Sequence, residues 1–139
     1  MAEPKYQKIT AFAIKKVRAG AKPEDAWLQA LEEFYPVDKL QSQIKHSCPK
    51  WAFCALCHKG FIREIRKNCC SASEKSSSGA YVIKALTQLI ADKSLATDKQ
   101  KLKHSIFGIK GTSEYRTPND EVEVLLALWN AGEIQEQSS

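Results

Sequence analysis

Two apolar stretches with the same pattern constrain the centre of this chain. Residues 52–62 read Ala-Phe-Cys-Ala-Leu-Cys-His-Lys-Gly-Phe-Ile, and residues 124–134 read Val-Leu-Leu-Ala-Leu-Trp-Asn-Ala-Gly-Glu-Ile. In each, an apolar run ends at a glycine, which suits the left-handed end of a helix, and an isoleucine follows two residues later. A helix that is apolar on most sides is normally enclosed by its neighbours. We therefore predict an all-α bundle of about six helices, with central helices near 49–59 and 118–131.

The match between the two stretches has two interpretations. Four of the eleven aligned positions are identical, as expected if a duplication left two helix–turn units related by a pseudo-twofold axis. The simpler interpretation is that a buried helix with a left-handed glycine at its end needs an apolar residue soon afterwards to cover its last turn. The flanking residues show no continued match. Both interpretations place the two helices in the core, with Gly60 and Gly132 as their caps.

Helical spacing recurs before the first apolar run, and the alternation typical of strands hardly appears. A first helix is expected to end near Gly20. A second opens at Pro23, because proline suits the first helical turn, and ends at Pro36; a short third piece follows over 37–44. The inward stripes of the first two helices comprise Tyr6, Ile9, Ala13, Val17, Trp27, Leu31 and Phe34. The side of the first helix expected to face solvent carries Lys8, Lys15, Lys16 and Arg18.

Two further helices are expected between the apolar runs. One follows Ser78, a capping residue, and the other spans 97–107, because Thr97 and Gln100 have the spacing of a capping box. The inward residues of these helices are Val82, Leu86, Leu89, Ile90, Leu102 and Ile106. The lysines of the helix at 97–107 are expected to point away from its inward face.

The length of 139 residues allows one domain with a sizeable core. We predict a single helical domain over 1–134, interrupted by a mobile polar loop at 68–79, and a frayed tail at 135–139. The longest apolar run, 51–57, is far too short to cross a membrane, and the first residues lack the apolar stretch of a secretion signal. We therefore expect a cytoplasmic location with reduced thiols.

Five cysteines raise the question of a metal site. Cys54 and Cys57 form a Cys-x-x-Cys pair, but they lie inside an apolar helix and no second such pair follows. Zinc needs four ligands that converge as a tetrahedron, and the adjacent Cys69 and Cys70 cannot easily bind one ion together. Buried cysteines behave as small hydrophobic residues. We therefore predict no metal and no cofactor, with Cys54 and Cys57 in the core.

Cys48 is the candidate for thiol catalysis. It precedes Pro49 at a helix start, where the helix dipole and free backbone amides lower the pKa of a thiol, and His46 and Lys50 are near in sequence. No general base with an orienting acid and no oxyanion hole is evident. A cysteine can also cap a helix passively, so a thiol-dependent enzyme is the less favoured interpretation.

Two basic segments are candidates for binding nucleic acid. The first segment follows the helix near 49–59 and comprises Lys59, Arg63, Arg66 and Lys67. The second lies on the helix expected over 97–107 and comprises Lys99, Lys101 and Lys103. On a single face these residues would attract phosphates. The net charge of +5 is modest for such a function, and aromatic residues are not interleaved with these charges. A solvated, lysine-rich surface would explain them equally.

The charge surplus belongs to residues 1–70, with 13 basic and 7 acidic residues.

Three segments together resemble a family of small bacterial proteins of unknown function. They are 48–62, Cys-Pro-Lys-Trp-Ala-Phe-Cys-Ala-Leu-Cys-His-Lys-Gly-Phe-Ile, then 79–86 and 124–134. The family has the pattern Cys-Pro-Lys-x-Ala-Phe-x-x-Leu-Cys and ends close to Leu-Ala-Leu-Trp-x-x-Gly-x-Ile. The likeness covers residues 46 to 134, and Cys54 stands where the family usually has a glycine or another small residue. The resemblance implies a bacterial or phage setting and no known activity.

The sequence favours a non-enzymatic protein-interaction or regulatory module. It contains no phosphate-binding loop, no paired catalytic acids and no metal-ligand spacing. The expected partner is another protein, with nucleic acid as the alternative and no membrane; the oligomeric state is left open. Candidate contact residues are Tyr115 and Arg116 in the irregular segment 111–117, together with the polar loop.

Overall fold

Helices account for most of the chain that the computed structural model describes, namely residues 4–45, 48–65, 77–106 and 119–135. They are α1 (Pro4–Arg18), α2 (Pro23–Phe34), α3 (Val37–Lys45), α4 (Cys48–His58), α5 (Ser77–Ala91), the 3₁₀ helix η2 (Lys93–Thr97), α6 (Lys99–Ile106) and α7 (Asn119–Asn130). Within these ranges no strand occurs beyond one isolated β-bridge. The all-α prediction is confirmed, with seven described α-helices because the short piece at 37–44 is a helix of its own.

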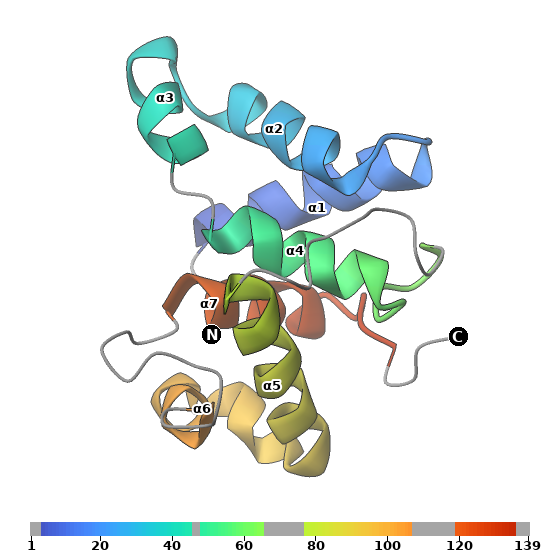
Figure 1. Cartoon of the computed structure of the whole chain (residues 1–139), viewed down its shortest axis with the longest axis vertical. Helices are drawn as coiled ribbons and strands as arrows, with labels where there is room; N and C mark the ends of the chain where they lie inside the picture. The colour runs from blue at the N-terminus through green and yellow to red at the C-terminus, as the bar shows by residue number, and fades with distance from the viewer. Residues whose placement is uncertain (1–3, 46–47, 66–76, 107–118, 136–139) are drawn as a thin grey trace.

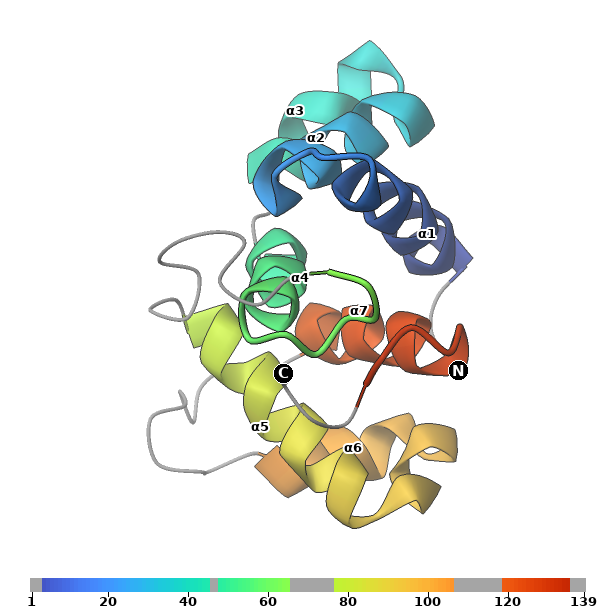
Figure 2. The same cartoon turned by 90° about the vertical axis from the view of Figure 1, so that its right-hand side faces the viewer.

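The helices are stacked in three tiers along the longest axis of the molecule (Figures 1 and 2). The upper tier holds α1, α2 and α3, the middle tier α4 and α7, and the lower tier α5, η2 and α6. The middle tier contacts both others, since α4 packs on α2, α5 and α7, and α7 also packs on α1 and α6. The two apolar runs therefore form the central helices, as predicted.

Burial follows the apolar runs. Every side chain from Ala52 to Cys57 is inaccessible to solvent, as are Val122 and the stretch from Val124 to Leu126. Trp27 packs on Phe53 with 5.4 Å between ring centroids, which joins the upper tier to α4. Burial of each large apolar side chain contributes about 1.5–3 kcal/mol. None of the described helices combines the length and apolar character needed to cross a bilayer.

The central helices end in the same way, at the two predicted glycine caps. The φ angle is +80° at Gly60 and +76° at Gly132, a left-handed conformation that costs glycine little. The closing bonds correspond one to one: Gly60 N–H to Cys57 O (3.1 Å) and Phe61 N–H to Leu56 O (3.0 Å) after α4, Gly132 N–H to Trp129 O (3.1 Å) and Glu133 N–H to Leu128 O (3.0 Å) after α7. Each pair is a Schellman motif, which satisfies carbonyls at the end of its helix.

The segments that follow the two caps pair with each other. Ile62 and Ile134 form an antiparallel bridge. It is flanked by reciprocal bonds, from Arg63 N–H to Glu133 O and from Gln135 N–H to Phe61 O, both 2.8 Å long. Because the bonds are reciprocal, a local twofold axis relates the two turns. The identical isoleucines of the repeated pattern are thus direct partners, rather than two independent covers of separate helix ends.

Phe34, predicted to face inward, is 42% exposed. Its ring packs edge-on against Phe12 of α1, with 5.8 Å between centroids and 79° between planes. Of the three residues predicted to face inward on α2, Trp27 and Leu31 are buried, and the prediction was wrong for Phe34 in the last turn.

Two helix starts also differ from the prediction. Asp98, not Thr97, caps α6, since its Oδ1 accepts a hydrogen bond of 3.1 Å from the N–H of Lys101. Thr97 ends η2 instead, and its hydroxyl donates to the carbonyl of Ser94 at 2.9 Å. Helix α5 begins at Ser77, so the last three residues of the predicted 68–79 loop are helical; the rest of that loop lies outside the described residues.

Candidate binding surface

A groove runs along the outer side of α1, next to the end of α2. Two hollows of about 580 and 250 Å³ both include Lys8 and Phe34 in their linings and so form one depression. We call it the α1 groove, and its defining residues are Lys8, Phe12, Lys15, Arg18, Phe34 and Glu133. Glu133 is the one acid among the described residues that line it.

The sequence of α1 explains the character of this groove. Its fifteen residues include five basic ones and no acid: Lys5, Lys8, Lys15, Lys16 and Arg18. Tyr6, Ile9 and Ala13 turn inward and are buried. Lys8, Phe12 and Lys15 have spacings of four and three residues, which align them along another side of the helix. Both lysines are exposed and Phe12 is half-buried.

An aromatic corner lies between these lysines. The edge-on pair of Phe12 and Phe34 forms it, and the Lys16 ammonium lies 5.3 Å from the Phe12 ring centroid. A cation near an aromatic face is attracted by the ring quadrupole. The exposed part of Phe34 offers apolar contact area within a basic rim. This combination suits a ligand that carries both negative charge and an apolar group.

Arg18 closes one end of the groove. Its Nη2 and Nη1 lie 2.8 Å and 3.3 Å from the two carboxylate oxygens of Glu133, and Nη2 also donates to the carbonyl of Arg63 at 2.9 Å. Its Nε lies 3.3 Å from a carboxylate oxygen of Glu64. The hydrogen bond with Glu133 raises the pKa of Arg18. Since Glu133 is neutralised in this way, the lysines determine the charge of the groove.

Those of the predicted basic residues that the structure describes do not form one surface. Lys59 and Arg63 lie in the turn after α4, whereas Lys99, Lys101 and Lys103 lie on α6. Figure 1 places that turn and α6 on opposite sides of the molecule. Arg66 and Lys67 lie outside the described residues, as do the predicted contact residues Tyr115 and Arg116.

Two of the α6 lysines face α7. The Nζ atoms of Lys99 and Lys103 lie 2.6 Å and 4.0 Å from the same carboxylate oxygen of Glu123. The side chains of Glu123 and Lys103 are only 4% and 9% exposed. The prediction that the lysines of this helix point elsewhere is therefore wrong for Lys103, because a buried carboxylate requires a countercharge. Lys101 is exposed.

The described cysteines belong to the core. Cys54 and Cys57 are buried free thiols in α4, which confirms that part of the prediction. Among the described residues, no group of three or more His, Cys, Asp or Glu side chains could hold a metal ion. Cys48 is the first residue of α4, and its side chain lies outside the described part, as do Cys69 and Cys70.

The groove residues were not among the predicted sites, although one signal was present. Residues 4–18 concentrate basic charge without acids, and Phe12 lies between the lysines. The contribution of Phe34 could not be anticipated, because its spacing fits the inward stripe of α2. The buried acids Glu121 and Glu123 were also missed.

Comparison with known proteins covers nearly the whole chain. The model of a family of unknown function (DUF6979) matches residues 3–135, a range that includes α1 and the groove as well as the two central helices. No curated protein and no solved structure matches the chain. The chain therefore belongs to this family of unknown function, DUF6979.

Proposed function

We propose that this protein is a non-enzymatic interaction module that binds an acidic segment of a partner protein in the α1 groove. The observation that carries the proposal is the aromatic corner of Phe12 and Phe34 between exposed lysines. Exposed aromatic side chains in a hollow are typical anchors of protein interfaces. Lysines around them attract and orient an oppositely charged partner.

The charge distribution supports an acidic partner. Lys8 and Lys15 border the groove, and the guanidinium of Arg18 is already paired with Glu133. A partner carboxylate would therefore meet the lysines first. An apolar side chain three or four residues away on a partner helix would then reach the Phe12 and Phe34 rings.

Single-stranded nucleic acid is the alternative, since it combines phosphates with stacking bases. The 79° angle between the Phe12 and Phe34 rings favours a protein partner, because the rings make a corner rather than parallel platforms for successive bases. The separation of the 59–63 turn from α6, and the pairing of Lys99 and Lys103 with Glu123, also weaken the nucleic-acid interpretation.

Fluorescence anisotropy with two labelled probes tests the proposal. One probe is a glutamate-rich peptide with phenylalanine or leucine at every third or fourth position, and the other is single-stranded DNA of the same net charge. We expect the peptide to bind more tightly, and its affinity to fall about tenfold or more in the Lys8→Glu/Lys15→Glu variant. Phe34→Ala should weaken peptide binding without a change in net charge.

The matched control is Lys101→Glu, an exposed lysine on α6 at the other end of the molecule (Figure 1). It should leave peptide binding close to that of the wild type. Peptide binding that survives the Lys8→Glu/Lys15→Glu change would refute the groove as the site. Tighter binding of the DNA, lost in the same variant, would replace the protein partner with nucleic acid.

A further inference from the structure

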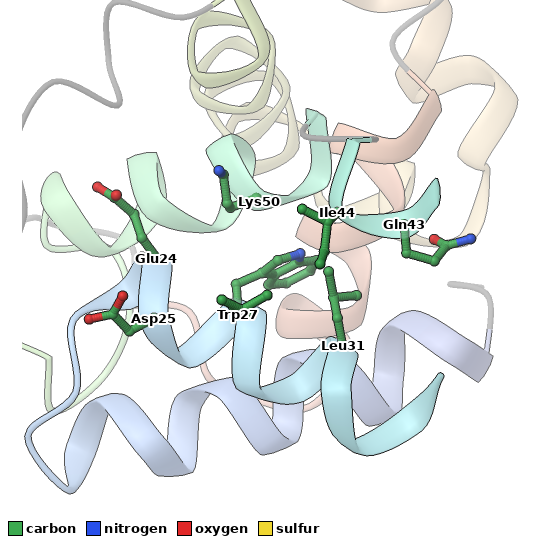
Figure 3. A pocket seen from close by; sticks show the side chains of 8 residues that line it. Glu24, Asp25, Trp27, Leu31, Gln43, Ile44 and Lys50 are labelled. Atoms are coloured by element: carbon green, nitrogen blue, oxygen red, sulfur yellow. The ribbon is translucent and has the colours of Figure 1, made fainter. Parts of the chain in front are cut away.

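A second pocket lies where α2, α3 and α4 meet (Figure 3). Its volume is about 210 Å³. The side chains that decide its chemistry are Trp27, Leu31, Ile44, Glu24, Asp25 and Lys50. The described residues that line it do not overlap with those of the α1 groove. A ligand of this pocket would therefore not depend on the binding proposed for the α1 groove.

The pocket arises from the spacing of residues on α2. Glu24, Trp27 and Leu31 follow one another at intervals of three and four, which places them on one side of the helix. The opposite wall includes Ile44 of α3, and none of the nine described residues of that helix is buried. This wall is thus held less firmly than α2 and α4, whose facing side chains belong to the core.

The floor of the pocket is apolar and rigid. Trp27 is only 1% exposed and is backed by Phe53, so it forms the buried base of the pocket, and an occupant would meet mainly the more exposed Leu28 and Ile44. Figure 3 shows Leu31 and Ile44 beside the indole and Glu24 and Asp25 at the opposite end. A ligand whose apolar part rests against Ile44, above Trp27, would therefore have its polar end near the two carboxylates.

The charge at that end is negative. Glu24 and Asp25 contribute two carboxylates in the first turn of α2, which exceeds the roughly half positive charge of a helix N-terminus. Lys50 also lines the pocket, and its ammonium lies 4.3 Å from the Trp51 ring centroid. One lysine against two carboxylates leaves the charged lining net negative. In Figure 3 the Lys50 side chain rises from α4 away from the indole.

We propose that this pocket binds a small organic cation, a free arylalkylammonium compound. Its ring would lie against Leu28 and Ile44, above the buried Trp27, and its ammonium would lie near Glu24 and Asp25. The volume is below the roughly 300–1,000 Å³ typical of sites for drug-sized ligands, and so it accommodates a single ring with a short chain.

Chemical-shift titration of the Trp27 indole N–H tests this proposal, with the resonance assigned by its loss in Trp27→Phe. The probes are phenethylamine, the neutral 2-phenylethanol and the anionic phenylacetate. We expect phenethylamine to bind most tightly and phenylacetate most weakly. In Glu24→Gln/Asp25→Asn the advantage of the amine over the alcohol should fall about three- to tenfold, the range expected for two partly exposed ion pairs.

The matched control is Glu32→Gln/Glu33→Gln, which removes two exposed acids of the same helix that do not line the pocket. It should retain the preference for the amine, as should the groove variant Lys8→Glu/Lys15→Glu. Equal affinity for the three probes, or the absence of a Trp27 shift with phenethylamine, would overturn the proposal. Binding of N-acetyl-lysinamide but not of phenethylamine would do the same and indicate a polypeptide side chain as the ligand.

Discussion

At the scale of single residues, Glu123 is expected to contribute strongly to stability. Its carboxylate is buried on α7 and is the countercharge for Lys103, which is itself buried. Glu123→Ala leaves that ammonium in a low-dielectric environment, so we expect the free energy of unfolding to fall by about 3 kcal/mol or more. Urea denaturation followed by circular dichroism measures this change.

The control for Glu123 replaces both buried charges. Glu123→Leu combined with Lys103→Met removes the desolvation cost of both groups, and we expect it to recover most of the lost stability. Lys99 is 26% exposed at its side chain and can turn to solvent. A loss below about 0.5 kcal/mol in Glu123→Ala would show that the ion pair does not stabilise the α6–α7 contact.

Arg18 is expected to couple α1 to the turn after α7. Arg18→Ala and Glu133→Ala should each destabilise the protein, and the double variant should lose less than the sum, by about 1 kcal/mol. The expected coupling is modest because both side chains are about one-quarter exposed. Glu64→Ala is the comparison, since its side chain is 77% exposed and should contribute little. Strictly additive losses would mean that the bidentate pair contributes no coupling.

At the scale of the elements, replacing the glycine in the left-handed cap of α7 is expected to lower the stability of the protein. Gly132→Ala should lower the free energy of unfolding by about 1–2 kcal/mol, the cost of a left-handed conformation for a residue with a Cβ. The added methyl group would meet no atom within 4 Å, so no steric clash contributes. Gly132→Asn should lose less, because asparagine tolerates this conformation. Equal stability of all three proteins in urea would contradict this account.

The elements that sequence could predict are those where spacing and end signals agree. Pro23 and Pro36 bound α2, and Gly60 and Gly132 end the central helices as expected. The start of α6 was displaced by one residue because Thr97 and Asp98 are both capping residues, and the 3₁₀ turn of η2 uses the first of them.

The sites were less predictable than the helices, because each depends on how helices cross. Phe34 fits the inward stripe of α2 by spacing, but the end of that helix meets Phe12 on the outer side of α1. Lys103 resembles any lysine of a polar helix until Glu123 is found opposite it. Segments far apart in sequence supply these partners, and periodicity within one helix gives no information about them.

At the scale of the whole molecule, α2 connects the two candidate binding regions. It contributes Phe34 to the α1 groove and Trp27 to the second pocket, on opposite sides of Leu31 in the sequence. The basic surplus of residues 1–70 is consistent with a basic groove in the upper tier, although the pocket beside it is acidic at one end. The two regions are thus suited to ligands of opposite charge.

The bridge between Ile62 and Ile134 also affects where this chain can tolerate changes in length. It closes a loop that contains α5, η2, α6 and α7, and the entropic cost of closing a flexible loop rises by only about 0.6 kcal/mol when its length doubles. Insertions between those helices should therefore destabilise the bridge only slightly. A single residue inserted between Gly60 and Ile62 would instead turn the isoleucine to the opposite face of the pairing. We therefore expect this chain to tolerate changes in the length of the loop better than changes in the two short turns that close it.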